Sequence, residues 1–165
     1  MGFHIKRLPD GSIDNYKARL VAKGFHQWLG VDYHDTFSSV IKLTTIRLAL
    51  SLTFSKGWQL RQLNVNNAFL QGHLFTDVYM AQPLGFVDRD NPTHVCKLKK
   101  AIYGLKQAPW AWYLELCQFL IESRFTNSHT DTSLFIIHSS DITIYLFVYV
   151  DDWLLLKKCY LIAYN

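Results

Sequence analysis

Two adjacent aspartates, Asp151 and Asp152, interrupt the apolar stretch LFVYVDDWLLL at residues 146–156. Paired carboxylates can hold hard cations such as Mg²⁺, and phosphoryl transfer often uses two ions bridged by carboxylates. The pair could also be a solvated turn, because Asp is a common turn residue. A metal site needs a further acid from a neighbouring strand end. The candidate segment is QLNVNNAFLQG, residues 62–72.

The elements around these residues are predicted to be strands. ITIYLFVYV, residues 142–150, is rich in β-branched and aromatic residues, and WLLLKK after the aspartates is again strand-like. Asp151 and Asp152 should therefore sit at the tip of a hairpin. SLFIIH, residues 133–138, is predicted to pair with the first arm. Residues 58–70 begin as an alternating strand that ends in the polar stretch 64–67.

The rest of the chain alternates short strands with two helices. A hairpin is predicted around PDGS at residues 9–12, and strands in DVYMAQPLGF and HVCKLKK. One helix is predicted over 44–57, with Thr44 or Thr45 as N-cap and Gly57 past its end. A second should have Pro109 in its first turn, end near Arg124 and bury one face. That face contains Trp112, Leu116, Phe119 and Leu120.

Composition favours a globular, intracellular protein. The 165 residues are 50% hydrophobic, enough for one core, and no repeat or linker divides them. Three dispersed cysteines fit neither a disulfide framework nor a zinc site. The charged N-terminal segment lacks the apolar region of a signal peptide. The longest apolar run, Ile142 to Val150, is shorter than the roughly 20 residues of a membrane span. We expect a cytoplasmic, non-secreted protein without membrane contact.

The basic residues are clustered, and the net charge is +4. Residues 97–106 contain four lysines and no acid: Lys97, Lys99, Lys100 and Lys106. Such a cluster suits a polyanionic partner, although a solvated face is the alternative.

Five segments together resemble the reverse transcriptase of Ty1/copia-type retrotransposons. They are YKARLVAKGF at 16–25, QLNVNNAFLQG at 62–72, VCKLKKAIYGLKQAP at 95–109, AWY at 111–113 and YVDD at 149–152. The resemblance covers about residues 4–157 and rests on the order and spacing of all five. It implies an α+β fold, the fingers and palm portion of a right-hand polymerase, and residues 1–165 as a single partial domain.

The resemblance also implies roles for particular residues. Asp151 and Asp152 would be the acidic pair of the catalytic hairpin and would hold the metal, with Asp151 the firmer ligand. Phe69 would lie under the incoming sugar and disfavour a ribose 2′-OH, although it could instead be an ordinary core aromatic. The remaining positions would contact the nucleotide or the nucleic acid. They are Lys17 and Arg19 at the triphosphate, Gly104, Lys106 and Gln107 at the nucleotide and template, and Lys97, Lys99 and Lys100 at phosphates.

The chain departs from the family at two positions. Asn64 stands where the family has a catalytic Asp, so a third carboxylate is missing from a site meant to hold two divalent ions. Trp110 stands where the family usually has Arg. The resemblance also ends soon after the hairpin, before the end of the palm and without the thumb. We therefore expect an unpaired apolar edge after the hairpin, which invites aggregation.

The sequence is compatible with three functions. The first is RNA-directed DNA polymerase by descent, joining a primer 3′-OH to a dNTP with two Mg²⁺ or Mn²⁺ ions, with activity impaired or absent here. Its partners would be an RNA or DNA template with primer, dNTPs, and the remainder of a Pol polyprotein in an intact element. The second is a non-catalytic nucleic-acid-binding module, and the third is a decayed remnant without a selected function.

Overall fold

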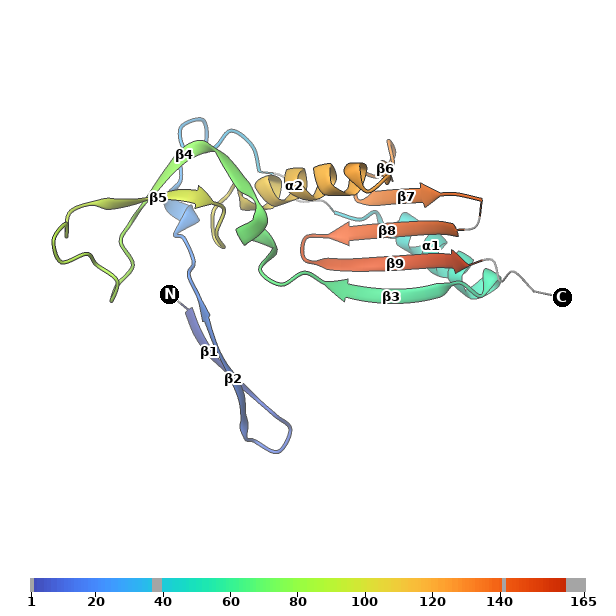
Figure 1. Ribbon diagram of the computed structural model, residues 1–165, viewed down its shortest axis with the longest axis horizontal. Helices are drawn as coiled ribbons and strands as arrows, with labels where there is room; N and C mark the ends of the chain where they lie inside the picture. Colours follow the sequence, from blue (N-terminus) through green and yellow to red (C-terminus); the bar gives the residue numbers. More distant parts are fainter. Residues whose placement is uncertain (1, 37–39, 141, 160–165) are drawn as a thin grey trace. The chain divides into compact units, whose positions relative to one another are not determined.

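The computed structural model describes residues 2–36, 40–140 and 142–159, with the side chain of Cys159 not described. Its elements confirm the predicted α+β class, with short antiparallel sheets and two helices of 14 and 15 residues. The chain forms two compact units, each built from two separate stretches of sequence. The first unit is Met1–Thr36 with Phe69–Trp112, and the second is Phe37–Ala68 with Tyr113–Asn165. Figure 1 labels the elements of both.

The first unit contains two β-hairpins. Their strands are β1 (Gly2–Arg7) with β2 (Ile13–Arg19), and β4 (His73–Ala81) with β5 (Val95–Lys100), both antiparallel. The predicted turn around PDGS is confirmed. Asp10 closes it, because its Oδ1 accepts hydrogen bonds from the backbone N and the Oγ of Ser12, and Gly11 supplies a positive φ of 88°.

The core of the first unit forms where the segment after β5 enters helix α2 (Ala108–Glu122). Its buried members are Ala101, Ile102, Leu105, Ala108 and Ala111. Phe69 packs against this cluster from the short 3₁₀ helix η2 (Ala68–Gln71). A second 3₁₀ helix, η1 (Gly24–His26), lies earlier in the chain.

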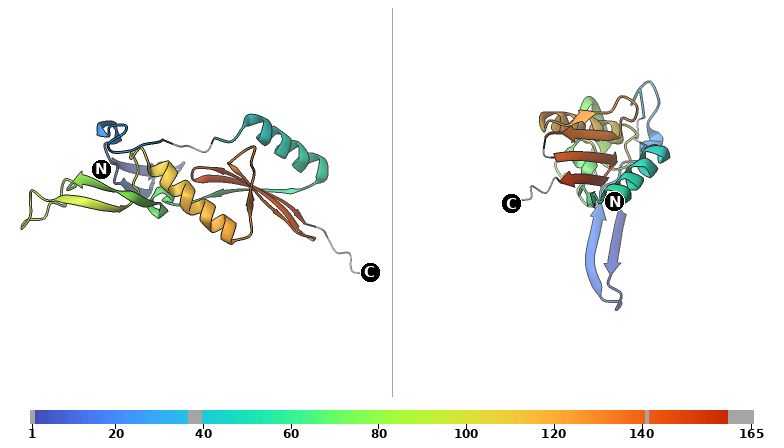
Figure 2. Two further views of the ribbon diagram at one scale, coloured as in Figure 1. Left: turned by 90° about the horizontal axis from the view of Figure 1, so that it is seen from above. Right: turned by 90° about the vertical axis from the view of Figure 1, so that its right-hand side faces the viewer.

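The second unit is built on a five-stranded antiparallel sheet. The strand order is β3-β9-β8-β7-β6. The bounds are β3 Gln59–Asn64, β6 Thr126–Asn127, β7 Leu134–His138, β8 Ile142–Tyr149 and β9 Asp152–Cys159. Helix α1 (Leu43–Lys56) and the C-terminal part of α2 lie on opposite faces of this sheet (Figure 2). Both faces of its central strands are therefore covered, which explains the nearly continuous apolar sequence of β8.

Two sequence predictions about the helices need correction. Helix α1 is capped by Lys42, which has extended backbone angles, and not by Thr44 or Thr45. Its start is fixed by Asp131, whose Oδ2 accepts a hydrogen bond from the Lys42 backbone N at 3.3 Å. In α2, Leu116 and Leu120 are buried as predicted, but Phe119 is 60% exposed. The buried stripe there is rotated away from Phe119.

The expected free edge after the catalytic hairpin is also absent from the described structure. Strand β9 pairs with β8 on one side and with β3 on the other. The sequence prediction was wrong because β3, which lies far upstream, supplies the neighbour that later strands were expected to provide. Among the described residues, no helix is long and apolar enough to span a membrane.

Candidate catalytic hairpin and nucleotide-binding region

The tip of the β8–β9 hairpin presents the two aspartates. Tyr149 and Asp152 form the last cross-strand pair, so Val150 and Asp151 make the two-residue turn. Val150 has a positive φ of 54°, which is strained for a β-branched residue. Strained backbone of this kind is retained where surrounding structure fixes it, often at functional sites. Asp151 is half-buried and Asp152 is exposed.

Asn64 lies directly beside this tip, as predicted. It is the last residue of β3 and pairs with Asp152 across the β3–β9 ladder. Its Nδ2 donates a hydrogen bond to Oδ1 of Asp152 at 3.0 Å. The backbone N of Val65 then donates to the carbonyl of Asp151 at 2.8 Å and extends the contact to the turn. The structure therefore brings together all three positions predicted to be catalytic.

These three side chains do not fit a two-metal site. Within the described ranges, no group of three or more His, Cys, Asp or Glu side chains could hold a metal ion. The third side chain at the tip is an amide, which carries no charge to offset divalent cations. In this arrangement the nitrogen of that amide faces Asp152 and donates a hydrogen bond to its carboxylate.

In the first unit, Arg19 and Phe69 meet around one tyrosine. The rings of Phe69 and Tyr103 are edge to face, with centroids 4.8 Å apart. The guanidinium carbon of Arg19 lies 5.7 Å from the Tyr103 ring centroid, within cation–π range. Tyr103 lies in the segment VCKLKKAIYGLKQAP but was not among the predicted site residues. Phe69 is half-buried against the core cluster, so it also has the packing role that was left open.

Gly104 lies where two backbone segments come into close contact. Its φ is 90°, a conformation that suits glycine. A Cβ at Gly104 would overlap the carbonyl of Ala22, and a Cβ at Gly24 would overlap the carbonyl of Gly104. The backbone N of Ala22 also donates to the carbonyl of Tyr103 at 2.7 Å. The close approach therefore requires glycine on both segments.

Gln27 organises the next two predicted residues, and sequence reasoning missed it. Its Oε1 accepts a hydrogen bond from the backbone N of Lys106 at 2.8 Å. Its Nε2 donates to Oε1 of Gln107 at 2.9 Å. The Nε2 of Gln107 in turn donates to the carbonyl of Asp32 at 3.4 Å. The side chain of Gln107 is thus held by protein contacts.

The cations of the first unit have different electrostatic settings. On the β1–β2 hairpin, repulsion from Lys6 and a side-chain contact with it hold the pKa of Lys17 below its ordinary value. On β5, the Nζ of Lys97 forms an ion pair with Asp77 at 2.7 Å, which raises the pKa of Lys97 and lowers that of Asp77. Lys99 and Lys100 are exposed on the same strand.

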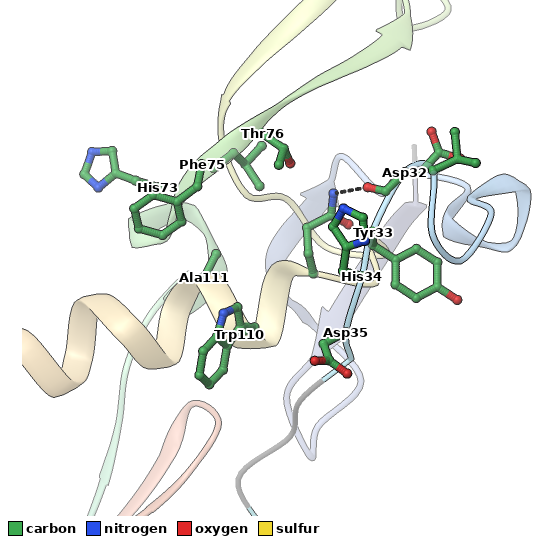
Figure 3. A pocket seen from close by; sticks show the side chains of 12 residues that line it. Asp32, Tyr33, His34, Asp35, His73, Phe75, Thr76, Trp110 and Ala111 are labelled. Atoms are coloured by element: carbon green, nitrogen blue, oxygen red, sulfur yellow. Dashed lines mark hydrogen bonds between the residues drawn. The ribbon is translucent and has the colours of Figure 1, made fainter.

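Trp110 lines a cavity of about 290 Å³ in the first unit. Figure 3 shows its indole together with His73, Phe75 and His34, and with the hydrogen bond from Gln107 to Asp32. From the sequence resemblance, Arg was expected at this position. The substitution thus places a large ring, 38% exposed, in the wall of a mixed aromatic and acidic pocket.

Comparison with known proteins agrees with the sequence resemblance. A family model described as reverse transcriptase (RNA-dependent DNA polymerase) matches residues 3–162. The retrovirus-related Pol polyprotein from transposon RE1 of Arabidopsis thaliana is 58% identical over 153 residues, covering 93% of this chain and 10% of the relative. That from transposon TNT 1-94 of Nicotiana tabacum is 41% identical over 157 residues, covering 94% of this chain and 12% of the relative.

More distant similarity reaches yeast. The Transposon Ty1-NL2 Gag-Pol polyprotein of Saccharomyces cerevisiae is 31% identical over 163 residues, covering 94% of this chain and 8% of the relative. No solved structure matches the chain. The chain spans about a tenth of the length of these three curated relatives. Because the family model and these relatives cover nearly the whole chain, it belongs to the reverse transcriptase family of Ty1/copia-type retrotransposons.

Proposed function

We propose that this chain is the fingers and palm portion of an RNA-directed DNA polymerase, descended from an active enzyme and catalytically defective. The second unit corresponds to the palm, and the two hairpins of the first unit belong to the fingers. Both units form one reverse transcriptase domain of a Pol polyprotein. The observation that carries the proposal is the pairing of Asn64 with Asp152 at the tip of the β8–β9 hairpin.

The residues proposed to bind the nucleotide lie in the first unit. Arg19 and Lys17 would meet the triphosphate of a dNTP, and Phe69 would lie under its sugar. The Arg19–Tyr103–Phe69 cluster supports this assignment, because it orders a cation and an aromatic face together before a ligand arrives. Gly104, Lys106 and Gln107 would border the nucleotide and template through the segment that Gln27 holds.

Primer and template would be held by charge. Lys97, Lys99 and Lys100 are exposed on β5, and Lys6 lies close enough to Lys17 to lower its pKa. A bound polyanion would reduce the repulsion between neighbouring lysines. The clustered lysines therefore also favour the second candidate function, nucleic-acid binding without chemistry.

The divalent ions that the family uses would supply charge neutralisation at the reacting phosphate. Asp151 and Asp152 would contact them only beside a third carboxylate, which this chain lacks at Asn64. Since the amide of Asn64 removes one negative charge from this set, we expect at most trace polymerisation from the natural chain.

Primer extension tests the proposal. The purified chain and its Asn64→Asp variant are incubated with a labelled primer–template, dNTPs and Mg²⁺ or Mn²⁺. We expect at most trace extension by the natural chain and single-nucleotide, poorly processive extension by the variant. Efficient extension by the natural chain would overturn the proposed defect.

Binding is measured separately from chemistry. The affinity for the same primer–template is determined by fluorescence anisotropy over a series of salt concentrations, with an uncharged polymer as control. Salt-dependent binding without extension in either protein would favour the nucleic-acid-binding module. If neither protein binds or extends the primer–template, the results would favour a decayed remnant without a selected function.

A further inference from the structure

We propose that Asn64 has converted the inherited metal position into a metal-independent clamp, in which its amide takes the place of a cation beside Asp152. The inference rests on the proposed correspondence of Asn64, Asp151 and Asp152 with the catalytic carboxylates of the family. Beyond that correspondence, Asn64 has a structural role of its own, because it holds the tip of the hairpin against β3 without a divalent ion.

The ladder geometry makes the contact unavoidable. Asn64 and Asp152 are directly opposite each other in the antiparallel β3–β9 pair. Directly opposite side chains lie on the same face of a sheet, with Cβ atoms about 4.5–5.5 Å apart. The Val65 N to Asp151 carbonyl hydrogen bond, at 2.8 Å, fixes the backbone immediately beyond this pair. Whatever side chain occupies position 64 must therefore face the Asp152 carboxylate.

The charge of the side chain at position 64 decides whether a cation is needed beside Asp152. Two carboxylates in this position repel each other and require a cation between them. An amide instead donates a hydrogen bond to the carboxylate, as Nδ2 of Asn64 does to Oδ1 of Asp152 at 3.0 Å. The opposite amide orientation would point an oxygen at an oxygen, so the hydrogen-bond network selects the donor orientation. The amide thus satisfies Asp152 and needs no ion.

The clamp has a consequence that can be measured without enzymatic activity. The thermal stability of the natural chain should not depend on Mg²⁺, whereas that of the Asn64→Asp variant should. In the variant the donor is lost and a like charge is introduced, and Mg²⁺ binding by the folded state compensates for both.

The experiment compares melting temperatures in EDTA and in millimolar Mg²⁺, followed by far-UV circular dichroism. For the natural chain we expect the same Tm in both conditions. For Asn64→Asp we expect a Tm roughly 2–4 °C lower in EDTA and recovery in Mg²⁺. Asn64→Ala, which removes the donor without adding charge, should lose stability equally in both conditions.

The double variant Asn64→Asp with Asp152→Asn provides the matched control. It exchanges the two groups across the ladder, so one carboxylate again faces one amide. We expect its Tm to return toward that of the natural chain and to be insensitive to Mg²⁺. This control also separates the clamp from general damage to folding at position 64.

Two results would overturn the inference. One is a natural chain that Mg²⁺ stabilises as strongly as it stabilises Asn64→Asp. The other is a double variant that remains as unstable as Asn64→Asp in EDTA. Failure of the proposed polymerase ancestry would instead appear in the separate assays, as an Asn64→Asp variant that neither binds nor extends a primer–template.

Discussion

The ring of Phe69 meets the ring of Tyr103 edge to face, with an interplanar angle of 65° and centroids 4.8 Å apart. Edge-to-face pairs at this distance are favourable beyond the apolar area that they bury. Tyr103 in turn contacts Arg19 through its ring, at 5.7 Å from the guanidinium carbon. A residue proposed to select the sugar is therefore also part of the packing that positions a cation.

Phe69→Ala should destabilise the chain by about 2 kcal/mol, less than the roughly 3–5 kcal/mol of fully buried Phe→Ala changes because Phe69 is half-buried. Urea denaturation monitored by circular dichroism measures the loss. Phe3→Ala is the control, since Phe3 is 77% exposed and its removal should cost little. Equal effects of the two changes would show that Phe69 does not pack as described.

Gly104→Ala should prevent the close approach of the segments around Ala22 and Gly104. The added Cβ would overlap a backbone carbonyl, and the alanine would have to adopt a positive φ. Together these effects should lower the free energy of unfolding by about 3 kcal/mol or more. Gly2→Ala is a suitable control because nothing lies within 4 Å of its Cβ position. Thermal denaturation compares the two. A Gly104→Ala chain as stable as Gly2→Ala would contradict the contact.

Lys6→Ala should raise the pKa of Lys17, because Lys6 is the largest cause of its depression. Because the pKa of Lys17 is lowered in the folded state, folding disfavours the charged form of this side chain. The hairpin should therefore gain stability as pH rises from that lowered pKa to the unfolded value near 10.4, and this gain should be smaller in Lys6→Ala. NMR titration of the Lys17 side chain measures the pKa directly. Lys23→Ala should leave it unchanged.

Asp77→Asn should strengthen binding to nucleic acid by freeing Lys97 from its ion pair. The pair is exposed on both sides, with side chains 56% and 61% accessible, so its loss should not change the melting temperature measurably. The slope of log K against the logarithm of the salt concentration should become steeper by the contribution of about one phosphate contact. Anisotropy titrations at several salt concentrations provide the slope. An unchanged slope would mean that Lys97 does not contact phosphates.

Local pattern was sufficient to predict most elements of the fold. The β8–β9 hairpin, both helices and the PDGS turn follow from periodicity, turn residues and Gly57, which has the predicted left-handed conformation. The position of Asn64 beside the aspartates was also predictable, because the two strand ends must meet to share a site. These predictions required knowledge of local sequence or of the family, but not of strand order.

Long-range pairing could not be predicted from local sequence patterns. Strand β9 was expected to end the sheet, yet it lies between β3 and β8. The end of β3 was expected near the hairpin tip, but no local signal shows that β3 pairs with β9 along its whole length. The same holds for Gln27, whose hydrogen-bond partner Lys106 is 79 residues away. Lys97 was expected to face a polyanion, and its partner in the free chain is Asp77 from the neighbouring strand.

The placement of β9 between β3 and β8 also determines when the sheet can form during synthesis. Asn64 and Asp152 are separated by 88 residues, so at typical translation rates β3 waits roughly 4–18 s for its partner to leave the ribosome. During that interval the whole stretch Phe69–Trp112 of the first unit is made. Leu60 and Leu63 of β3 have no β9 to pair with until then, so a nascent chain stalled before β9 would present β3 to chaperones or to other chains.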